Sequence, residues 1–317
     1  MSNIKSFFQE IHTDVADIID TDFEYNSTKL VPNRSDSGLT FGKNQIKKGK
    51  ILETCVLFVD IRNSVGLTEA HKQKTMAKLY TAFTKSVIKS AKKYNGHIRN
   101  IIGDRVMVVF EVDNCFINAI NCAISINHSA KIITNIFSQV EFKCGIGIDY
   151  GEMRVLKVGI QKNGTDSIEH RGLVWSGKPA NLASRLTDAA NKQIEEVYFN
   201  VKYKTLYPMW NLKDLGLPNT PTVHTKRLTP DEFLNDIQSS DNGSLKLGFF
   251  ETVLSYKKEK IQKNIPAILI SDKVYKEYKK VNLNGKDITN NWWKKVDYKI
   301  KNVNYDVYGA SLIWKID

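Results

Sequence analysis

The order of apolar and polar segments in this 317-residue chain predicts an α+β fold, a ferredoxin-like split βαβ sheet with helices. Two observations carry this prediction. An apolar, β-branched run over 54–59 ends abruptly on Asp60, and a second apolar segment over 101–110 contains Gly103-Asp104. The first run is typical of a buried strand, and the second of a hairpin that turns at Gly103-Asp104.

The segments around these strands complete the expected order. Residues 69–94 carry an apolar stripe at helical spacing and stop near Gly96. We expect a second helix over 114–137, and then a strand over 142–149 that leads to a turn at Tyr150-Gly151. Strand, helix, hairpin, helix, strand is the order of a split βαβ sheet with its helices on one face.

The flanking segments are less regular. Residues 1–25 have helical amphipathicity, so we expect a helix that packs on the core or on a partner subunit. The polar segment 26–48 predicts an exposed loop, and the pattern from 194 to 264 is irregular. The remaining expected elements are a strand at 266–271, a helix at 272–281 and a hairpin over 298–308.

The composition indicates a folded protein with a sizeable core, because 42% of the residues are hydrophobic and 10% are aromatic. No apolar run is long enough to cross a bilayer and no signal sequence is evident, so we expect a soluble, cytoplasmic protein. Four cysteines lie in apolar contexts without CxxC spacing, which predicts buried thiols rather than a zinc site. The six histidines show no metal-ligand spacing.

The net charge is +12, and the segment from Lys257 onward holds fourteen lysines against seven acidic residues, a surplus of seven. A solvated face explains this surplus best, and attraction of a polyanionic nucleotide is the second explanation. Lysine without matching arginine and aromatic residues is weak support for nucleic-acid binding.

Asp60 and Asp104 are the first candidate functional residues. A carboxylate at the end of a buried strand is costly unless it is paired or binds a metal. Each aspartate alone is explained better as a cap of backbone amides. As a pair on adjacent strands, they could face each other and hold divalent cations against phosphate oxygens.

A helix is expected to start near Pro179 in the segment 177–186. Asn181 and Arg185 lie four residues apart in it, so both project from one helical face. In isolation, Asn181 would be a helix cap and Arg185 a surface ion-pair residue.

Four motifs together resemble the ordered signature of class III nucleotidyl cyclases: residues 59–64, 102–104, 145–148 and 181–185. The segment 266–308 resembles that family's last strand, helix and hairpin. The resemblance covers roughly 52–191 and 265–310. It implies a catalytic domain over 49–317, interrupted by an insertion at about 192–264 and preceded by an N-terminal helix and exposed loop over 1–48.

The resemblance also implies a metal site. Asp60, Asp104 and the Ile61 carbonyl would bind two divalent cations, Mg²⁺ or Mn²⁺, which activate the ribose 3′-hydroxyl and neutralise the triphosphate. Phosphates would be held by the amides of Arg62, Asn63 and Ser64.

By the same resemblance, Asn181 would orient the ribose and Arg185 would stabilise charge on the α-phosphate. Lys299 or Lys301 would contact the triphosphate, although a solvated strand face explains these lysines equally well. The two aspartates would come from one subunit and Asn181 and Arg185 from the other, in a homodimer with two composite sites. The products would be a 3′,5′-cyclic nucleotide and pyrophosphate.

The chain departs from the family at the positions that contact the base. Adenylate cyclases of this class place a lysine where this chain has Asn100, and Asp or Thr where it has Val174-Trp175-Ser176. Changing groups that hydrogen-bond the base should change the base, and Trp175 could fill volume that a purine needs. Asn100 does not decide between CTP and UTP, because an amide both donates and accepts.

These departures resemble the pyrimidine cyclases of bacterial Pycsar anti-phage systems, which make cyclic CMP or cyclic UMP for a separate effector. The substrate implied is CTP or UTP. The alternatives are an adenylate cyclase with a remodelled base pocket, and a non-catalytic module that binds nucleotide or nucleic acid.

Overall fold

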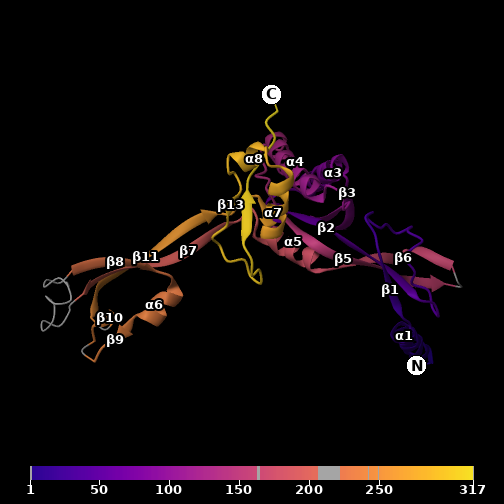
Figure 1. Ribbon diagram of the computed structural model, residues 1–317, viewed down its shortest axis with the longest axis horizontal. Coiled ribbons are helices and arrows are strands. Elements are labelled where there is room, and N and C mark those ends of the chain that lie inside the picture. The colour runs from indigo at the N-terminus through magenta and orange to yellow at the C-terminus, as the bar shows by residue number, and fades with distance from the viewer. Residues whose placement is uncertain (1, 163–164, 206–221, 242, 249, 317) are drawn as a thin grey trace. The chain divides into compact units, whose positions relative to one another are not determined.

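The computed structural model describes residues 2–162, 165–205, 222–241, 243–248 and 250–316. The chain forms two compact units (Figure 1). Unit 1 comprises Met1–Lys192 and Ile265–Asp317, and unit 2 comprises Gln193–Asn264.

Unit 1 is built on a mixed sheet with the order β13-β14-β12-β5-β2-β4-β3, in which β1 also pairs with β2 and β6 with β5. The two central strands are antiparallel, and Asp60 near the end of β2 lies opposite Gly145 near the start of β5. The strands of this sheet are β1 (Phe23–Ser27), β2 (Lys47–Ile61), β3 (Gly96–Ile102), β4 (Arg105–Phe110), β5 (Cys144–Lys162), β6 (Thr165–Ser176), β12 (Ile268–Ser271), β13 (Lys294–Lys295) and β14 (Val307–Ala310).

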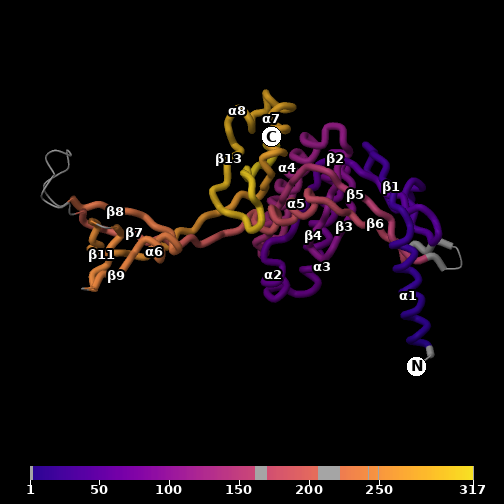
Figure 2. Tube along the Cα trace, turned by 60° about the horizontal axis from the view of Figure 1, so that its bottom comes forward, coloured from indigo at the N-terminus to yellow at the C-terminus, as the bar shows by residue number. Residues whose placement is uncertain are grey.

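Alternating side chains of the strands build a core on each face of this sheet. Leu57 and Val59 belong to the larger core, which α3 (Gln73–Lys93), α4 (Cys115–Ile136) and α7 (Asp272–Val281) cover. The helices α3 and α4 pack against each other (Figures 1 and 2). Val56 faces the smaller core, which α5 (Lys178–Ala189) covers. The split βαβ arrangement is therefore confirmed, and α5 adds a helix on the opposite face.

The predicted helices over 69–94 and 114–137 are confirmed, although a short helix, α2 (Ser64–Ala70), precedes α3. The predicted hairpin is confirmed as β3 and β4, and Gly103 in its turn has a φ of 59°, which glycine adopts without strain. The helix at 272–281 and the strand before it are also confirmed, as β12 and α7.

The predicted turn at Tyr150-Gly151 is wrong. The strand β5 continues through it to Lys162, and Gly151 pairs with Thr54 of β2. The cause is long-range, since β2 begins at Lys47 and offers a pairing edge along its whole length. Local turn residues do not stop a strand whose neighbour continues.

The segment 26–48 is only partly the exposed loop that its polarity predicts. It begins at the end of β1, and it buries Val31 and Leu39, which are 6% and 2% exposed, in the smaller core. Single apolar residues in a polar stretch have no periodicity, so the sequence alone could not reveal this anchoring.

The segment 194–264, whose sequence pattern is irregular, forms regular structure where it is described. Its described residues form a five-stranded antiparallel sheet of order β8-β7-β11-β10-β9. Phe199 stacks with Phe233 at a centroid distance of 4.1 Å. The strand β11 is mostly polar on both faces, which hides its periodicity, whereas the alternation of Val197, Phe199, Val201 and Tyr203 in β7 is a strand signal that the sequence prediction missed. The elements of unit 2 are β7 (Gln193–Thr205), β8 (Thr222–Leu228), α6 (Pro230–Asp236), β9 (Gln238–Ser239), β10 (Leu245–Gly248) and β11 (Glu251–Asn264).

The two ends of the chain differ from expectation in detail. The helix α1 (Ser2–Asp20) forms, but its apolar side chains do not pack on the sheet: Phe7 and Phe8 are 53% and 60% exposed. At the other end, the alternating residues 298–306 are not strands. They lie in the loop between β13 and β14. A short helix, α8 (Lys286–Thr289), precedes β13.

All four cysteines are free and buried, as predicted. Burial raises the pKa of the Cys144 thiol to about 12, so this thiol stays protonated and inert at neutral pH. No helix among the described residues has the length and apolarity to span a membrane.

Replacing Gly147 with alanine should destabilise the protein by about 1–3 kcal/mol, because overpacking forces backbone to move. A Cβ atom at Gly147 in β5 would lie 2.3 Å from the Ala183 carbonyl oxygen and 2.4 Å from the Thr187 amide nitrogen, both backbone atoms of α5. Thermal unfolding measures the effect. Gly172→Ala is the control, since nothing lies within 4 Å of a Cβ there. Equal melting temperatures for both variants would contradict the tight packing of α5 on β5.

Candidate active site

Asp60 lies near the end of β2 with its side chain 17% exposed. Two guanidinium groups hold its carboxylate: the Arg105 Nη2 atom lies 2.8 Å from Oδ2, and the Arg62 Nη2 atom lies 3.3 Å from it. A half-buried carboxylate needs such partners. Asp60 is therefore an organised anionic site rather than a simple backbone cap.

Arg105 connects Asp60 to α5. It forms an ion pair with Asp188 and donates to the Ser184 hydroxyl at 2.9 Å. Burial lowers the pKa of Arg105, but hydrogen bonds to Asp60 and Asp188 outweigh it, so the pKa is raised and the residue stays cationic. The sequence prediction missed Arg105, although its position directly after Gly103-Asp104 was a signal.

Asp104 lies in the turn between β3 and β4, at the same end of the sheet as Asp60. The register pairs Val59 with Val106, and Asp104 and Arg105 directly precede Val106, so both lie at the end of the hairpin near Asp60. The two predicted metal ligands therefore lie at the ends of adjacent strands, as the hairpin implied.

The donor set at this end of the sheet fits a hard cation, because carboxylate and carbonyl oxygens are the ligands that Mg²⁺ and Mn²⁺ prefer. The described residues contain no group of three or more His, Cys, Asp or Glu side chains that could hold a metal alone. Two carboxylates with the Ile61 carbonyl leave positions for substrate phosphate oxygens, which is the usual Mg²⁺ arrangement. A cation at Asp60 must compete with Arg62 and Arg105 for the Oδ2 atom.

The segment after Asp60 turns directly into α2. The Arg62 amide donates to the Lys143 carbonyl at 2.8 Å, so this predicted phosphate ligand is already engaged and we correct it. Asn63 has a φ of 54° and precedes α2, whose first residue is Ser64. The first amides of a helix have no intrahelical acceptors, which leaves those of Asn63 and Ser64 for phosphate.

Asn181 and Arg185 lie one turn apart on α5 and line one cavity of about 1040 Å³. The cavity lies between β5, the start of α5, the β12–α7 junction and the loop 302–305. The Arg185 Nη1 atom donates to the Asn302 carbonyl at 2.8 Å, so Arg185 ties α5 to the loop that carries the predicted lysines. The prediction that Asn181 and Arg185 share a face is confirmed by this common cavity.

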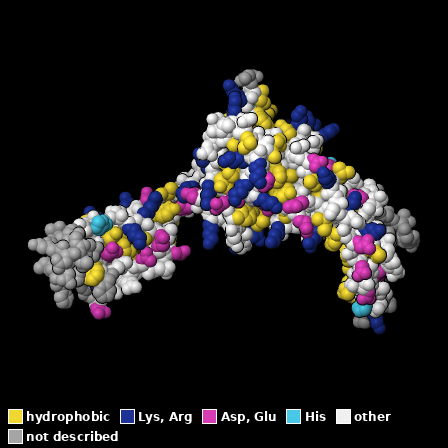
Figure 3. All heavy atoms as spheres, viewed as in Figure 1, with side chains coloured by type: hydrophobic (Ala, Val, Ile, Leu, Met, Phe, Trp, Pro, Cys, Tyr) yellow, Lys and Arg dark blue, Asp and Glu magenta, His cyan; other side chains and the backbone are white. Residues whose placement is uncertain are grey.

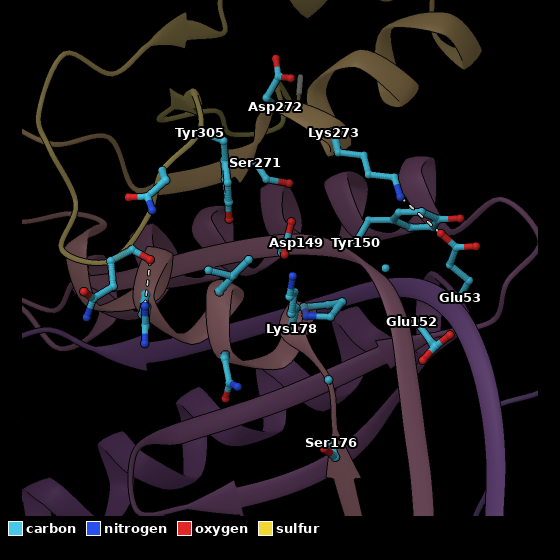
Figure 4. A pocket seen from close by; sticks show the side chains of 18 of the residues that line it. Glu53, Asp149, Tyr150, Glu152, Ser176, Lys178, Ser271, Asp272, Lys273 and Tyr305 are labelled. Atoms are coloured by element: carbon cyan, nitrogen blue, oxygen red, sulfur yellow. Dashed lines mark hydrogen bonds and ion pairs between the residues drawn. The ribbon is translucent and has the colours of Figure 1, made fainter. Parts of the chain in front are cut away.

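Charged groups of both signs surround this cavity. Lys273 lies 3.3 Å from a Glu53 carboxylate oxygen and 4.5 Å from the centroid of the Tyr150 ring (Figure 4). Asp149 is buried, and desolvation raises the pKa of its carboxyl. Burial also raises the pKa of Tyr305, whose hydroxyl has no hydrogen-bond partner in the described part of the chain. The sequence prediction assigned none of these residues to the site.

Lys299 and Lys301 are both exposed, and neither lines the cavity of Arg185. Lys299 lines a separate cavity of about 340 Å³ within the loop between β13 and β14. Lys301 directly precedes Asn302, whose carbonyl binds Arg185. Lys301 is therefore the lysine nearer in sequence to the Arg185 contact.

A second cavity, of about 810 Å³, brings together the predicted base-contacting residues Asn100, Val174 and Trp175, and it also borders Asn181. The Arg99 guanidinium lies 5.8 Å from the centroid of the Trp175 ring. Asn181 thus borders both the 810 Å³ cavity and the cavity of Arg185. Asp60 and Asp104 line neither of these cavities.

Residues 46–202 match the family model of the adenylate and guanylate cyclase catalytic domain. This region contains the aspartate-bearing strands and the α5 helix. The chain therefore belongs to the class III nucleotidyl cyclases, and it is a nucleotidyl cyclase with their fold. This family generally uses divalent metal cations.

Curated relatives include a uridylate cyclase from Burkholderia cepacia, 29% identical over 62% of this chain and 87% of the relative. A uridylate cyclase from Gulbenkiania mobilis is 26% identical over 80% of this chain and 95% of the relative. A cytidylate cyclase from Staphylococcus aureus is 33% identical, but over only 31% of this chain and 25% of the relative. Among solved structures, the adenylyl cyclase CyaB from P. aeruginosa aligns with a TM-score of 0.47 and 17% identity, covering 82% of this chain and 94% of that chain.

Proposed function

We propose that this chain is a pyrimidine nucleotide cyclase, which converts CTP or UTP to the 3′,5′-cyclic nucleotide and pyrophosphate. The observation that carries the proposal is the composition of the 810 Å³ cavity, where Asn100, Val174 and Trp175 stand in place of the purine-binding pair of adenylate cyclases. The names of the curated relatives, uridylate and cytidylate cyclases, support the same substrate class.

In this proposal the 3′-oxygen of the ribose attacks the α-phosphorus, the bond to the β-phosphate oxygen breaks, and the 3′-hydroxyl proton is lost. Asp60, Asp104 and the Ile61 carbonyl would hold two divalent cations, which would neutralise charge and lower the pKa of that hydroxyl. Asn181 orients the ribose. The Arg185 guanidinium stabilises the charge that develops on the α-phosphate, which a planar fork of donors suits.

We place the two halves of this site on different protomers. Asp60 and Asp104 lie outside the cavities that hold Asn181 and Arg185, so in this proposal a second copy of the chain brings these two aspartates to the substrate. The amides of Asn63 and Ser64 and one of Lys299 and Lys301 bind phosphates. The homodimer works in the cytoplasm and makes a second messenger in antiviral defence, which a separate effector protein detects.

Nucleic-acid binding receives less support than nucleotide binding. Lys and Arg side chains gather in the middle of the larger unit on the face drawn in Figure 3, but Asp and Glu side chains lie among them. A nucleic-acid surface is more uniformly basic than this.

Incubation of the protein with each of the four ribonucleoside triphosphates and Mn²⁺ tests the proposal. We expect cyclic UMP or cyclic CMP as the main product, because the cavity lacks the groups that bind adenine. Mass spectrometry identifies the product. Cyclic AMP as the main product would defeat the pyrimidine assignment, and no cyclic product from any of the four would indicate a non-catalytic module.

A further inference from the structure

Three consecutive residues ahead of β2, Asn33, Arg34 and Ser35, line the 810 Å³ cavity beside Asn100 and Trp175. We call them the N-terminal turn. They lie outside the family motifs, which begin at Val59, and in a segment whose polarity predicted an exposed loop. Their place in the cavity wall gives this segment a position from which it can contact the base.

The ends of this segment are fixed to the catalytic unit. Val31 and Leu39 are buried in the smaller core, so apolar burial holds the chain on both sides of the turn. The Asp36 carboxylate lies 2.6 Å from the Lys50 ammonium of β2, and Lys157 of β5 donates to the Asp36 carbonyl at 2.9 Å. The N-terminal turn is thus attached to both central strands of the sheet.

The turn itself has a defined backbone. The Ser35 amide donates to the Asn33 side-chain oxygen at 2.8 Å, and the Asp36 amide donates to the Asn33 carbonyl at 3.1 Å. Asparagine often stabilises turns in this way. The side-chain oxygen of Asn33 is therefore occupied. Arg34, at the centre of the turn, is exposed and has no partner among the described residues.

The turn is also linked to the strand that carries Asn100. The Arg99 Nη2 atom donates to the Val31 carbonyl at 3.3 Å, and the same guanidinium lies over Trp175. Arg99 therefore connects the start of the N-terminal segment with both predicted base-contacting elements. The turn is therefore anchored beside Asn100 and Trp175, the predicted base-contacting residues.

The cavity is rich in hydrogen-bond donors and holds no carboxylate among the described residues that line it. Arginine only donates, whereas Asn100 and Ser35 can donate or accept. Both bases present a carbonyl oxygen at C2. At C4 uracil presents an acceptor where cytosine presents an amino donor, and at N3 uracil presents a donor where cytosine presents an acceptor. A donor such as arginine placed at C4 therefore matches uracil, and Asn100 or Ser35 can accept from the uracil N3–H group.

We propose that Arg34 of the N-terminal turn is a specificity-determining residue that donates hydrogen bonds to the carbonyl oxygens of a pyrimidine base and favours UTP over CTP. This inference rests on the proposed cyclase function. It assigns to the segment before β2 a direct part in substrate choice.

The test compares kcat/KM for UTP and CTP in the wild-type protein, Arg34→Ala and Arg34→Gln. We expect the wild type to prefer UTP and Arg34→Ala to lose about tenfold in kcat/KM for UTP, the equivalent of one hydrogen bond to a charged donor. Arg34→Gln supplies an acceptor, so it should raise the use of CTP relative to UTP. Lys29→Ala is the matched control, because Lys29 is an exposed cation of the same segment and does not line the cavity.

Equilibrium binding of UTP provides a readout that does not depend on turnover, and Arg34→Ala should weaken it by a similar factor. An unchanged UTP-to-CTP ratio in both variants, or a wild type that prefers CTP, would overturn the role of Arg34 and leave the cyclase assignment intact. A wild type that binds UTP through Arg34 but forms no cyclic product would instead overturn the proposed function alone.

Discussion

Replacing Asp60 with alanine is expected to lower the cyclisation rate by about 10³-fold or more, a loss of ~4 kcal/mol of transition-state stabilisation. The carboxylate is the most strongly organised anion at the end of the sheet, held by Arg62 and Arg105. Its removal takes away a ligand from the cations and leaves two guanidinium groups without their shared partner. Initial rates of cyclic-nucleotide formation, measured at saturating Mn²⁺, check the expectation.

A structural effect of this change must be separated from the chemical one. Asp60→Asn keeps the shape and the hydrogen-bond acceptor for Arg105 but removes the charge, and it should be nearly as inactive as Asp60→Ala. Asp104→Ala should also be inactive, although Asp104 lies in a partly exposed turn where little packing is lost. A near wild-type rate for Asp60→Ala would exclude Asp60 as a metal ligand.

Replacing Arg185 with alanine should lower kcat by about 10²–10³-fold with a smaller effect on KM, as expected for a donor that acts on charge developing in the transition state. Arg185 lines the 1040 Å³ cavity and donates to the Asn302 carbonyl, so the loop between β13 and β14 positions its guanidinium. Arg185→Lys should recover only part of the rate, because an ammonium group cannot reproduce the planar fork.

Arg227→Ala is the matched control for Arg185. Arg227 lies in unit 2, where it pairs with Glu259 at 3.2 Å and stacks over Tyr198, so its loss should leave kcat unchanged. If Arg185→Ala instead raises KM and leaves kcat unchanged, Arg185 acts in ground-state binding rather than in the chemical step.

The fold of the catalytic unit could be predicted wherever the apolar pattern of a segment agrees with its burial in the structure. Continuous apolar runs gave the strand before Asp60 and the hairpin at Gly103-Asp104, because such runs are stable only inside a sheet. The spacing of Asn181 and Arg185 predicted their common face, which lines one cavity. These features depend on residues close in sequence.

The features that were missed depend on contacts between distant segments. Arg105 binds Asp188, and Val31 lies in the same core as Met153 and Val155 of β5. Because these residues are far apart in the sequence, no local pattern reveals the contacts. The sheet of unit 2 was missed because polar residues occupy both faces of β11, and the apolar alternation of Val197, Phe199 and Val201 in β7 was not recognised. The end of β5 was misplaced because its neighbour β2 extends further than local turn residues suggest. Pairing partners, rather than propensity, decided these elements.

The proposed division of the active site between two protomers is tested most directly by mixing Asp60→Ala with Arg185→Ala, each inactive alone. If each site takes its aspartates from one protomer and Arg185 from the other, half of the random dimers carry one intact site, and the mixture should regain about a quarter of the wild-type rate. Differently tagged protomers, purified through both tags, isolate the mixed dimer. A purified mixed dimer as inactive as either parent would contradict a composite site.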